Sequence, residues 1–330
     1  MKKVLVILLM LAVATTAFAG GRGQAAAGDG LISVGIVNNP PHESGYRAAN
    51  VAEMARVFSR ENGYNARTAN VTTLAEQIQA ATDFINAGVK YLLICPADMS
   101  GWVPTLQAAQ RAGVHVFVFD RMMEPAAMEL ITAFVGSDMV RQGQRAVAWL
   151  EAQNRPGGYR FIHINGQMGS AAQQGRGQPL HDAVRRHANW TIVREGTGGD
   201  TWSSDEARRI VEAAIAAGED FNTIYAENDG MAEGAMAALQ AAGISHGVYG
   251  DVWIMGFDFN RFALRYVMEG LWNFNGQCSP FQADVIHGFI QQLEAGEELN
   301  LPSKIVINPE TIIDYATITQ EFIDAYGLGD

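Results

Sequence analysis

The stretch YLLICPADMSGWVPTLQAAQRAGVHVFVFDR, residues 91–121, decides the fold of this chain. Residues 91–95 are an apolar run without alternation, which is typical of a strand buried on both faces of a parallel sheet. Residues 103–112 carry apolar side chains at helical spacing and end at Gly113, a common helix stop. Residues 114–119 are a second β-branched and aromatic run. The order strand, loop, helix, strand predicts a unit of a parallel α/β sheet.

The second of these strands ends abruptly at Asp120 and Arg121. Loops at the carboxyl ends of strands line the ligand crevice in open α/β sheets. A carboxylate beside a guanidinium there is either a structural ion pair or part of a site for a polyhydroxylated ligand. Position alone slightly favours the site.

The same alternation of strand-like and helix-like segments extends along the chain in two blocks. Strands are predicted at residues 32–37, 66–71 and 130–135 around the opening stretch, with Thr72 capping a helix over residues 75–87. The pattern restarts at residue 141, after a composition break at residues 136–139. Two α/β domains, each a doubly wound parallel sheet, fit this pattern better than one very large sheet.

The N-terminus has the features of a secretion signal. Lys2 and Lys3 precede an apolar run, and Ala17-Phe18-Ala19 supplies the small-x-small cleavage pattern. The run is shorter than the roughly 20 residues that span a bilayer. We therefore predict secretion, with a signal peptide at residues 1–19 cleaved after Ala19 and a flexible leader at residues 20–30; the family resemblance described below implies a periplasmic location.

Composition bears on the partners of the chain and on the state of its cysteines. The chain has 330 residues and a net charge of −12, and it lacks a basic run, which argues against a nucleic-acid partner. Its two cysteines, Cys95 and Cys278, could pair in an oxidising compartment, although two buried free thiols are the simpler interpretation.

Polar side chains gather where the predicted strands end. Carboxylate, amide and guanidinium groups suit vicinal hydroxyls, since a sugar hydroxyl both donates and accepts hydrogen bonds. Rings at Tyr46 and Trp202 could stack on the C–H face of a sugar. Surface loops are polar in any case, so the hypothesis depends on the whole set. The set is Glu43, Asp120, Arg121, Gln167, Arg176, Asn228, Asp229 and Asp258.

Enzyme and metal signatures are weak. The seven histidines show no HExxH or closely spaced metal-ligand pattern, and the chain has neither a GxSxG elbow nor a GxxxxGK[ST] loop. His163 lies within a predicted strand and is interpreted as a packed core histidine. The sequence therefore predicts no catalytic residue, no cofactor and no metal ligand.

Several motifs together resemble the periplasmic sugar-binding proteins of ABC importers, in the ribose and galactose cluster. CPADMSGW…AAQRAGVHVFVFDR is similar to the family's strand, loop, helix and Asp-Arg segment, with His115 at its usual proline. GSAAQQGRGQPL resembles its Gly-x-x-x-Ala-x-x-Arg-x-x-Gly-Phe segment, with Pro179-Leu180 in place of Gly-Phe. AENDGMAEGAMAALQAAG is similar to its Asn-Asp-x-Met-x-x-Gly-Ala helix start. MGFDFN resembles its Gly-x-Asp-Gly loop, with Phe259 in place of glycine. ESGYRAAN and SGWVPTLQAA resemble its galactofuranose-binding branch.

The resemblance implies a role for each residue that matches a family motif. Asp120 and Arg121 would hold ring hydroxyls from the first domain. Glu43, Tyr46 and Arg47 would act from the first loop.

Five further residues complete the implied site. Arg176, Asn228 and Asp258 would close on the ligand from the second domain. Gln277 stands just before the second crossover, where the family places a ligand-binding glutamine. Trp202 follows an Asp with one extra residue relative to the family's Asp-Phe.

The resemblance also implies the topology. A periplasmic binding protein-like, type I fold has two domains joined by a three-segment hinge. The first lobe would hold residues 31–138 plus 279–307, and the second residues 139–278 plus 308–330.

The function implied is capture of a monosaccharide, a galactose-type furanose or a related aldose, by a monomer that delivers it to an ABC permease. One alternative is a furanosyl signalling molecule or sugar sensed through a chemoreceptor or sensor kinase. A repressor effector domain would need a helix-turn-helix where the secretion signal stands. A secreted glycosidase is a further alternative, with Asp120 and Asp258 as its two carboxylates.

Overall fold

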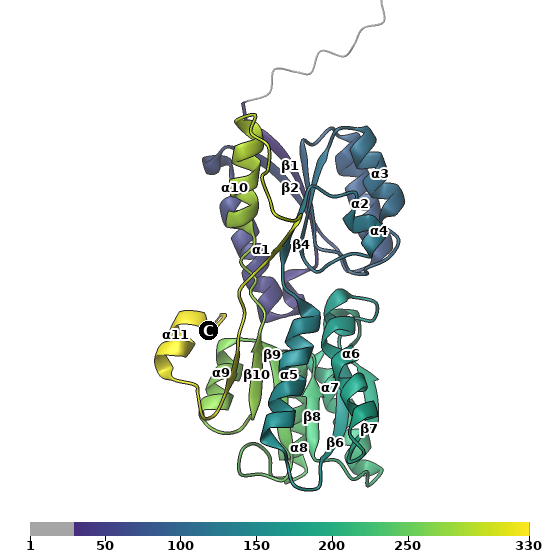
Figure 1. The fold of residues 1–330 in the computed structure, drawn as a ribbon, viewed down its shortest axis with the longest axis vertical. Helices are drawn as coiled ribbons and strands as arrows, with labels where there is room; N and C mark the ends of the chain where they lie inside the picture. The colour runs from purple at the N-terminus through teal and green to yellow at the C-terminus, as the bar shows by residue number, and fades with distance from the viewer. Residues whose placement is uncertain (1–29, 330) are drawn as a thin grey trace, which may run out of the picture.

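The computed structural model describes residues 30–329, which form two lobes stacked along the long axis of the molecule (Figure 1). The predicted signal peptide, and the predicted leader except Gly30, lie outside the described residues. Within residues 30–329 each lobe is built on a six-stranded sheet with helices on its faces. The predicted fold class, two α/β domains that are each built on a mostly parallel sheet, is confirmed.

The first lobe has the strand order β11-β5-β4-β3-β1-β2, and all its pairs are parallel among the described residues. Its strands are β1 (Ile32–Asn38), β2 (Tyr64–Asn70), β3 (Tyr91–Ile94), β4 (His115–Asp120), β5 (Ala133–Gly136) and β11 (Ile305–Ile307). Its helices are α1 (Gly45–Val57), α2 (Leu74–Asn86), α3 (Val103–Arg111), α4 (Pro125–Met128) and α10 (Ala283–Glu294), with 3-10 turns η1 (Pro41–Glu43) and η2 (Arg60–Asn62).

The second lobe repeats this plan with the order β12-β10-β9-β8-β6-β7, in which β12 runs antiparallel to β10. Its strands are β6 (Tyr159–Asn165), β7 (Trp190–Thr197), β8 (Thr223–Ala226), β9 (Trp253–Asp258), β10 (Phe274–Gln277) and β12 (Ile312–Asp314). Its helices are α5 (Met139–Gln153), α6 (Ala171–Arg186), α7 (Ser204–Ala216), α8 (Asp229–Ala241), α9 (Arg261–Met268) and α11 (Gln320–Tyr326), with the 3-10 turn η3 (Gly199–Thr201).

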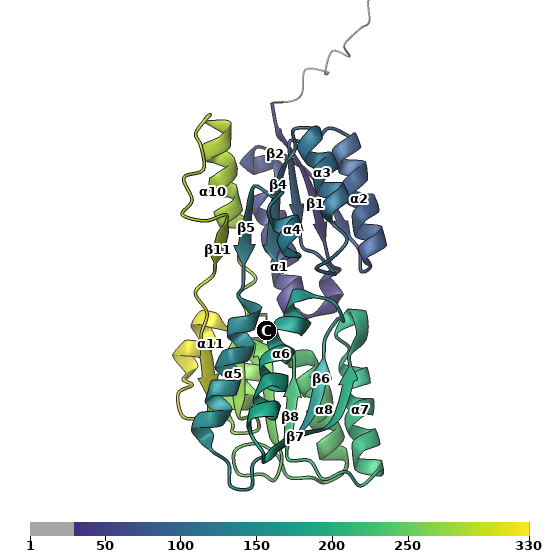
Figure 2. The ribbon, with the colours of Figure 1, turned by 45° about the vertical axis from the view of Figure 1, so that its right-hand side comes forward.

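The chain passes between the lobes after β5, after β10 and after β11 within residues 30–329, and these connections run side by side in both views (Figures 1 and 2). Three connections make a hinge rather than a single flexible linker. The boundaries given above for the two lobes stay a prediction.

Strand β3 shows why the opening stretch organises the first lobe. All four of its residues are buried, and alternate side chains point to opposite faces of the sheet. Leu92 and Ile94 pack in the core below α2 and α3, whereas Tyr91 and Leu93 pack in the core below α1 and α10. A strand between two helical layers must be apolar at every position, which explains the missing alternation.

Two local predictions need correction. Thr73, not Thr72, is the N-cap of α2, because its side chain accepts from the backbone N–H of Glu76 while Glu76 bonds back, forming a capping box. The strand predicted at residues 130–135 begins only at Ala133, because the short helix α4 at residues 125–128 and the turn that follows it occupy the chain up to residue 132. In the described part of the chain, every helix is too short or too polar to cross a membrane.

Candidate functional site

A cavity of ≈ 20 Å³ lies between the lobes, at the carboxyl ends of several strands. The cavity has room for about one water molecule. It is this small because side chains from both lobes occupy the rest of the cleft. Of the residues predicted for the site, Arg47, Gln167, Asp229 and Gln277 do not line the cavity, and all the others do. The lining residues are Glu43, Ser44, Tyr46, Asp120, Arg121, Met139, Ala172, Arg176, Trp202, Asn228, Asp258 and Cys278.

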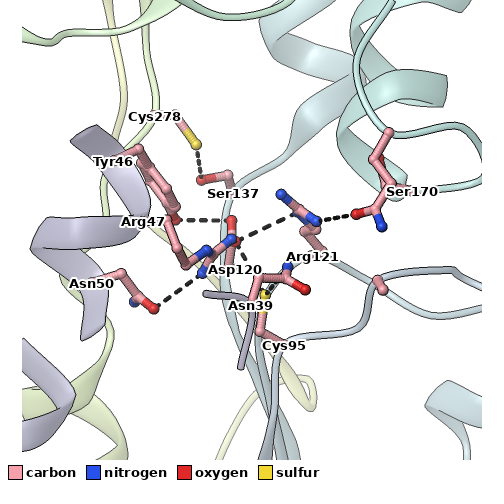
Figure 3. A network of polar contacts seen from close by, with 12 residues as sticks. Asn39, Tyr46, Arg47, Asn50, Cys95, Asp120, Arg121, Ser137, Ser170 and Cys278 are labelled. Carbon is pink, nitrogen blue, oxygen red and sulfur yellow. Dashed lines mark hydrogen bonds and ion pairs between the residues drawn. The ribbon is translucent and has the colours of Figure 1, made fainter. Parts of the chain in front are cut away.

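Asp120 is the centre of the first-lobe side of the site (Figure 3). The Tyr46 hydroxyl donates to its Oδ1 at 2.8 Å, and the Arg47 guanidinium forms an ion pair with its Oδ2. The Cys95 thiol donates to the same oxygen at 3.3 Å. Burial would raise the pKa of Asp120, but Arg47 and Arg121 together hold it below its ordinary value. Asp120 is therefore a fixed, ionised acceptor.

Arg121 joins the two lobes. It forms an ion pair with Glu43 of the first lobe, and its Nη1 donates to Oε1 of Gln167 of the second lobe at 3.0 Å. Its guanidinium lies 5.4 Å from the ring centroid of Trp202, also of the second lobe. One planar cation thus contacts a carboxylate, an amide and an indole, a combination suited to arginine.

Arg176 and Asp258 form the corresponding pair of the second lobe. The Arg176 Nη2 donates to Asp258 Oδ1 at 2.9 Å, and its Nε donates to Gln142 Oε1 at 2.9 Å. Both side chains are almost fully buried. The pKa of Asp258 is raised to about 6, chiefly by burial. Arg176 opposes this rise, and the charges of Asp120 and Glu43 add to it.

Asn228 and Trp202 complete the second-lobe wall. Asn228 caps α8, since its side-chain oxygen accepts from the backbone N–H of Met231 at 2.8 Å. Trp202 follows η3 and is 4% exposed, and its Nε1–H is buried with no hydrogen-bond partner among residues 30–329. An unpaired buried donor costs about 1–3 kcal/mol, so an acceptor that reached this group would remove that cost.

Arg47 and Gln277 lie outside the cavity. Arg47 is fully buried behind Asp120, where it also donates to Asn38 and Asn50 at 3.1 Å. Gln277 is the last residue of β10, and its side-chain oxygen accepts from the backbone N–H of Thr311 at 3.1 Å. The Arg47 side chain therefore binds Asp120, and the Gln277 side chain binds a connection between the lobes. Ligand contact by either residue stays a prediction.

Three residues of the site have a strained backbone conformation. Asp120 has φ 63°, Trp202 φ 53° and Asp258 φ 115°, in the left-handed region that non-glycine residues avoid. Each such residue costs of order 1–3 kcal/mol, and such strain concentrates at functional sites. The periodicity of the sequence does not predict this backbone strain.

Sequence reasoning missed part of the wall. Cys278 lines the cavity and lies 3.4 Å from the Ser137 hydroxyl. Met139 and Ala172 contribute apolar surface, which no polar-residue argument selects. Gln167 belongs to the predicted polar set, but only the tertiary structure shows its link to Arg121. Both cysteines are buried and free, as the simpler interpretation predicted.

Comparison with known proteins identifies the relatives of this chain. The family described as "Periplasmic binding protein domain" matches residues 34–286. The galactofuranose-binding protein YtfQ of Escherichia coli (strain K12) is 25% identical over 293 residues, which cover 87% of this chain and 89% of that protein. The fructose import binding protein FruE of Bifidobacterium longum (strain NCC 2705) is 26% identical over 309 residues, 90% of each chain.

A solved structure has the same fold. A protein from Mycobacterium smegmatis in complex with β-D-fucofuranose superposes with a TM-score of 0.78 and 26% sequence identity. The superposition covers 86% of this chain and 92% of that one.

Proposed function

The chain belongs to the periplasmic binding protein family, and from that premise we propose that it captures a monosaccharide between its two lobes for delivery to an ABC permease. The observation that carries the proposal is the cavity between the lobes, which is lined by charged groups from both sides and by Trp202, whose buried Nε1–H has no partner within residues 30–329. A sugar hydroxyl accepts from such a donor while donating to a carboxylate.

Binding works by exchange of partners. In this structure the polar groups of the cavity bond to one another, Asp120 to Tyr46 and Asp258 to Arg176. A sugar needs more room than ≈ 20 Å³, so the lobes part about the three connections and close again on the ligand. Hydroxyl groups then bond to Asp120, Arg121, Asp258 and Asn228. Since residues of both lobes contact the sugar only when closed, the ligand shifts the population toward the closed form.

The relatives support a furanose as the ligand class. One relative is named as a galactofuranose-binding protein, and the solved structure holds β-D-fucofuranose. We infer a five-membered ring of the galactose type or a related aldose for this chain, bound by a monomer in the periplasm.

A thermal-shift screen followed by calorimetry tests the proposal. The protein is unfolded and refolded to remove any co-purified ligand, then titrated with galactose, fucose, arabinose, ribose and fructose. A ligand specific for the native state raises stability by about RT ln(1 + [L]/Kd), ~4 kcal/mol at a thousandfold excess over Kd. A large shift with one sugar and none with its epimers supports the proposal. No shift with any of them contradicts it.

A binding role is favoured over glycoside hydrolysis. Hydrolysis needs one carboxylic acid that donates a proton and a second carboxylate that acts as a base or nucleophile. Asp258 has the raised pKa of an acid, but both oxygens of Asp120 are engaged by Tyr46 and Arg47, so Asp120 is a poor base or nucleophile. We expect no release of nitrophenol from nitrophenyl furanosides, and release that disappears in Asp258→Asn would contradict this assignment.

A further inference from the structure

Three metal-binding side chains converge in the second lobe, apart from the sugar cavity. His163 of β6, His181 of α6 and Glu195 of β7 come from neighbouring elements of that lobe (Figure 2). Oε1 of Glu195 lies 3.0 Å from Nδ1 of His163 and 3.1 Å from Nε2 of His181, and the three ligand atoms lie within 4.8 Å of one another.

The buried partner of His163 sets the orientation of its ring. Nε2 of His163 lies 3.1 Å from Oε1 of Glu227, whose other oxygen accepts from the backbone N–H of Gly166 at 2.8 Å. Glu227 and His163 are both fully buried. A carboxylate at Nε2 places the proton of a neutral imidazole on that nitrogen and leaves the Nδ1 lone pair free, as in carboxylate–histidine–zinc triads.

The other nitrogen has no hydrogen-bond partner. Nδ1 of the fully buried His163 is directed toward Glu195, yet within residues 30–329 it makes no hydrogen bond of acceptable geometry. A lone pair and a carboxylate oxygen 3.0 Å apart repel each other unless a positive species lies beside both. Ligand atoms about 3.3 Å apart are expected around tetrahedral Zn²⁺ with bonds of 2.0–2.1 Å, which is close to the two separations from Glu195 Oε1.

We propose that His163, His181 and Glu195 bind one Zn²⁺ ion. Two imidazoles with one carboxylate suit zinc and similar transition metals, whereas Ca²⁺ and Mg²⁺ prefer oxygen ligands alone. The Asn165 amide donates to Glu195 Oε1 at 2.9 Å and is itself held by Gln173, so the carboxylate is oriented from a second layer.

The site has access to solvent. A groove of ≈ 940 Å³, which shares only Met139 with the lining of the sugar cavity, is lined by His181, Glu195, Asn165 and Gln173. The groove provides an entry path and a fourth coordination position for water. The ion joins β6, α6 and β7, and the Gly166 backbone bonded to Glu227 lies against Trp202 of the sugar site. The zinc site therefore stabilises the second lobe beside the sugar wall without contacting the sugar.

Isothermal titration of the EDTA-treated protein with ZnCl₂ tests this site. We expect one ion per chain and a rise in the melting temperature with zinc. His181→Ala and Glu195→Gln, both at partly exposed positions, should weaken binding at least tenfold and abolish the thermal shift. The matched control is His187→Ala, because His187 pairs with Glu151 at 2.8 Å on the same lobe without a third ligand.

The outcomes separate a built site from adventitious binding. Tight one-to-one binding that survives His187→Ala but fails in the two site variants supports the proposal. Absence of binding in the unmodified protein overturns it and leaves a proton between His163 and the two carboxylates. Binding that is equally strong in His181→Ala also overturns it, since the ion then sits elsewhere.

Discussion

Asp120 and Asp258 occupy equivalent positions in the two lobes. Asp120 ends β4 and Asp258 ends β9, each the third strand of its sheet from the edge formed by β11 or β12. Each carboxylate pairs with an arginine from the helix that follows the first strand of its lobe, Arg47 of α1 and Arg176 of α6. They differ in charge environment, since Asp120 faces two arginines and Asp258 one. The site is thus built from two related halves with different acidities.

Replacing Asp120 should affect folding as well as binding. Asp120→Asn removes the nearer carboxylate of the buried Arg47 and leaves only Glu43 at 3.7 Å, and breaking a buried pair costs about 3–5 kcal/mol. We expect this loss in urea unfolding, together with loss of sugar binding. Asp182→Asn, which alters an exposed pair with Arg185, should change stability little. Equal stability of the two variants would contradict the assigned burial.

The pKa of Asp258 predicts a pH dependence of stability. Its pKa rises from 3.8 to about 6 on folding, first because of burial, so the folded state binds the proton more tightly than the unfolded state. The stabilisation is present below the unfolded pKa and is lost as pH rises through about 6. Each pKa unit is worth about 1.4 kcal/mol, so the loss between pH 4 and pH 6 approaches 3 kcal/mol.

Comparison with Asp258→Asn isolates this effect. The difference in unfolding free energy between the unmodified protein and the variant should decline as pH rises from 4 to 6 and then level off. A difference that stays flat, or that grows with pH, is incompatible with a raised pKa at Asp258.

Gly166 should tolerate no side chain. A Cβ at this position would lie 2.0 Å from the ring of Trp202. Gly166→Ala therefore displaces the indole, with an overpacking cost of about 1–3 kcal/mol and weaker sugar binding. Gly288→Ala is the matched control, since Gly288 lies in α10 with open space around it. That change should stabilise the protein by up to about 1 kcal/mol. Chemical denaturation and tryptophan fluorescence measure both effects.

Arg121→Lys should weaken sugar binding at least tenfold. A lysine ammonium cannot bond to Glu43 and Gln167 and stack on Trp202 at once, as the guanidinium does. Titration calorimetry with the sugar identified by the screen measures the change. Arg185→Lys, at an exposed pair with Asp182, should bind as the unmodified protein does. If Arg121→Lys also retains full affinity, the contact between the lobes does not support binding.

Phe259 tests strain against packing. It has φ 66°, which suits glycine, and its family counterpart is glycine, yet its ring is 1% exposed and lies 5.5 Å from the Phe322 ring. Phe259→Gly relieves about 1–2 kcal/mol of backbone strain but removes a buried ring worth about 3–5 kcal/mol. We expect net destabilisation in urea. A more stable variant would show that the strain outweighs the packing.

Much of the fold could be predicted because its causes are local. The buried strand at residues 91–95 and the helix stop at Gly113 follow from patterns a few residues long. The grouping of Glu43, Asp120, Arg121, Asn228 and Asp258 followed from their positions after strands, and these residues do line one cavity. Even so, the N-cap of α2 is Thr73 and not the predicted Thr72, because either threonine satisfies the local pattern.

By itself, the sequence determined the strand and helix alternation, the two-lobe class and the polar character of the strand ends. Only the tertiary structure decided which polar groups meet. Arg121 and Gln167 are separated by 46 residues, and His163 reaches Glu195 from another strand. Gln277 matched a family motif yet bonds to Thr311. The physical reason is that local patterns follow from backbone and solvent preferences within a few residues, whereas contacts between side chains depend on how the sheets order their strands and on how the lobes meet.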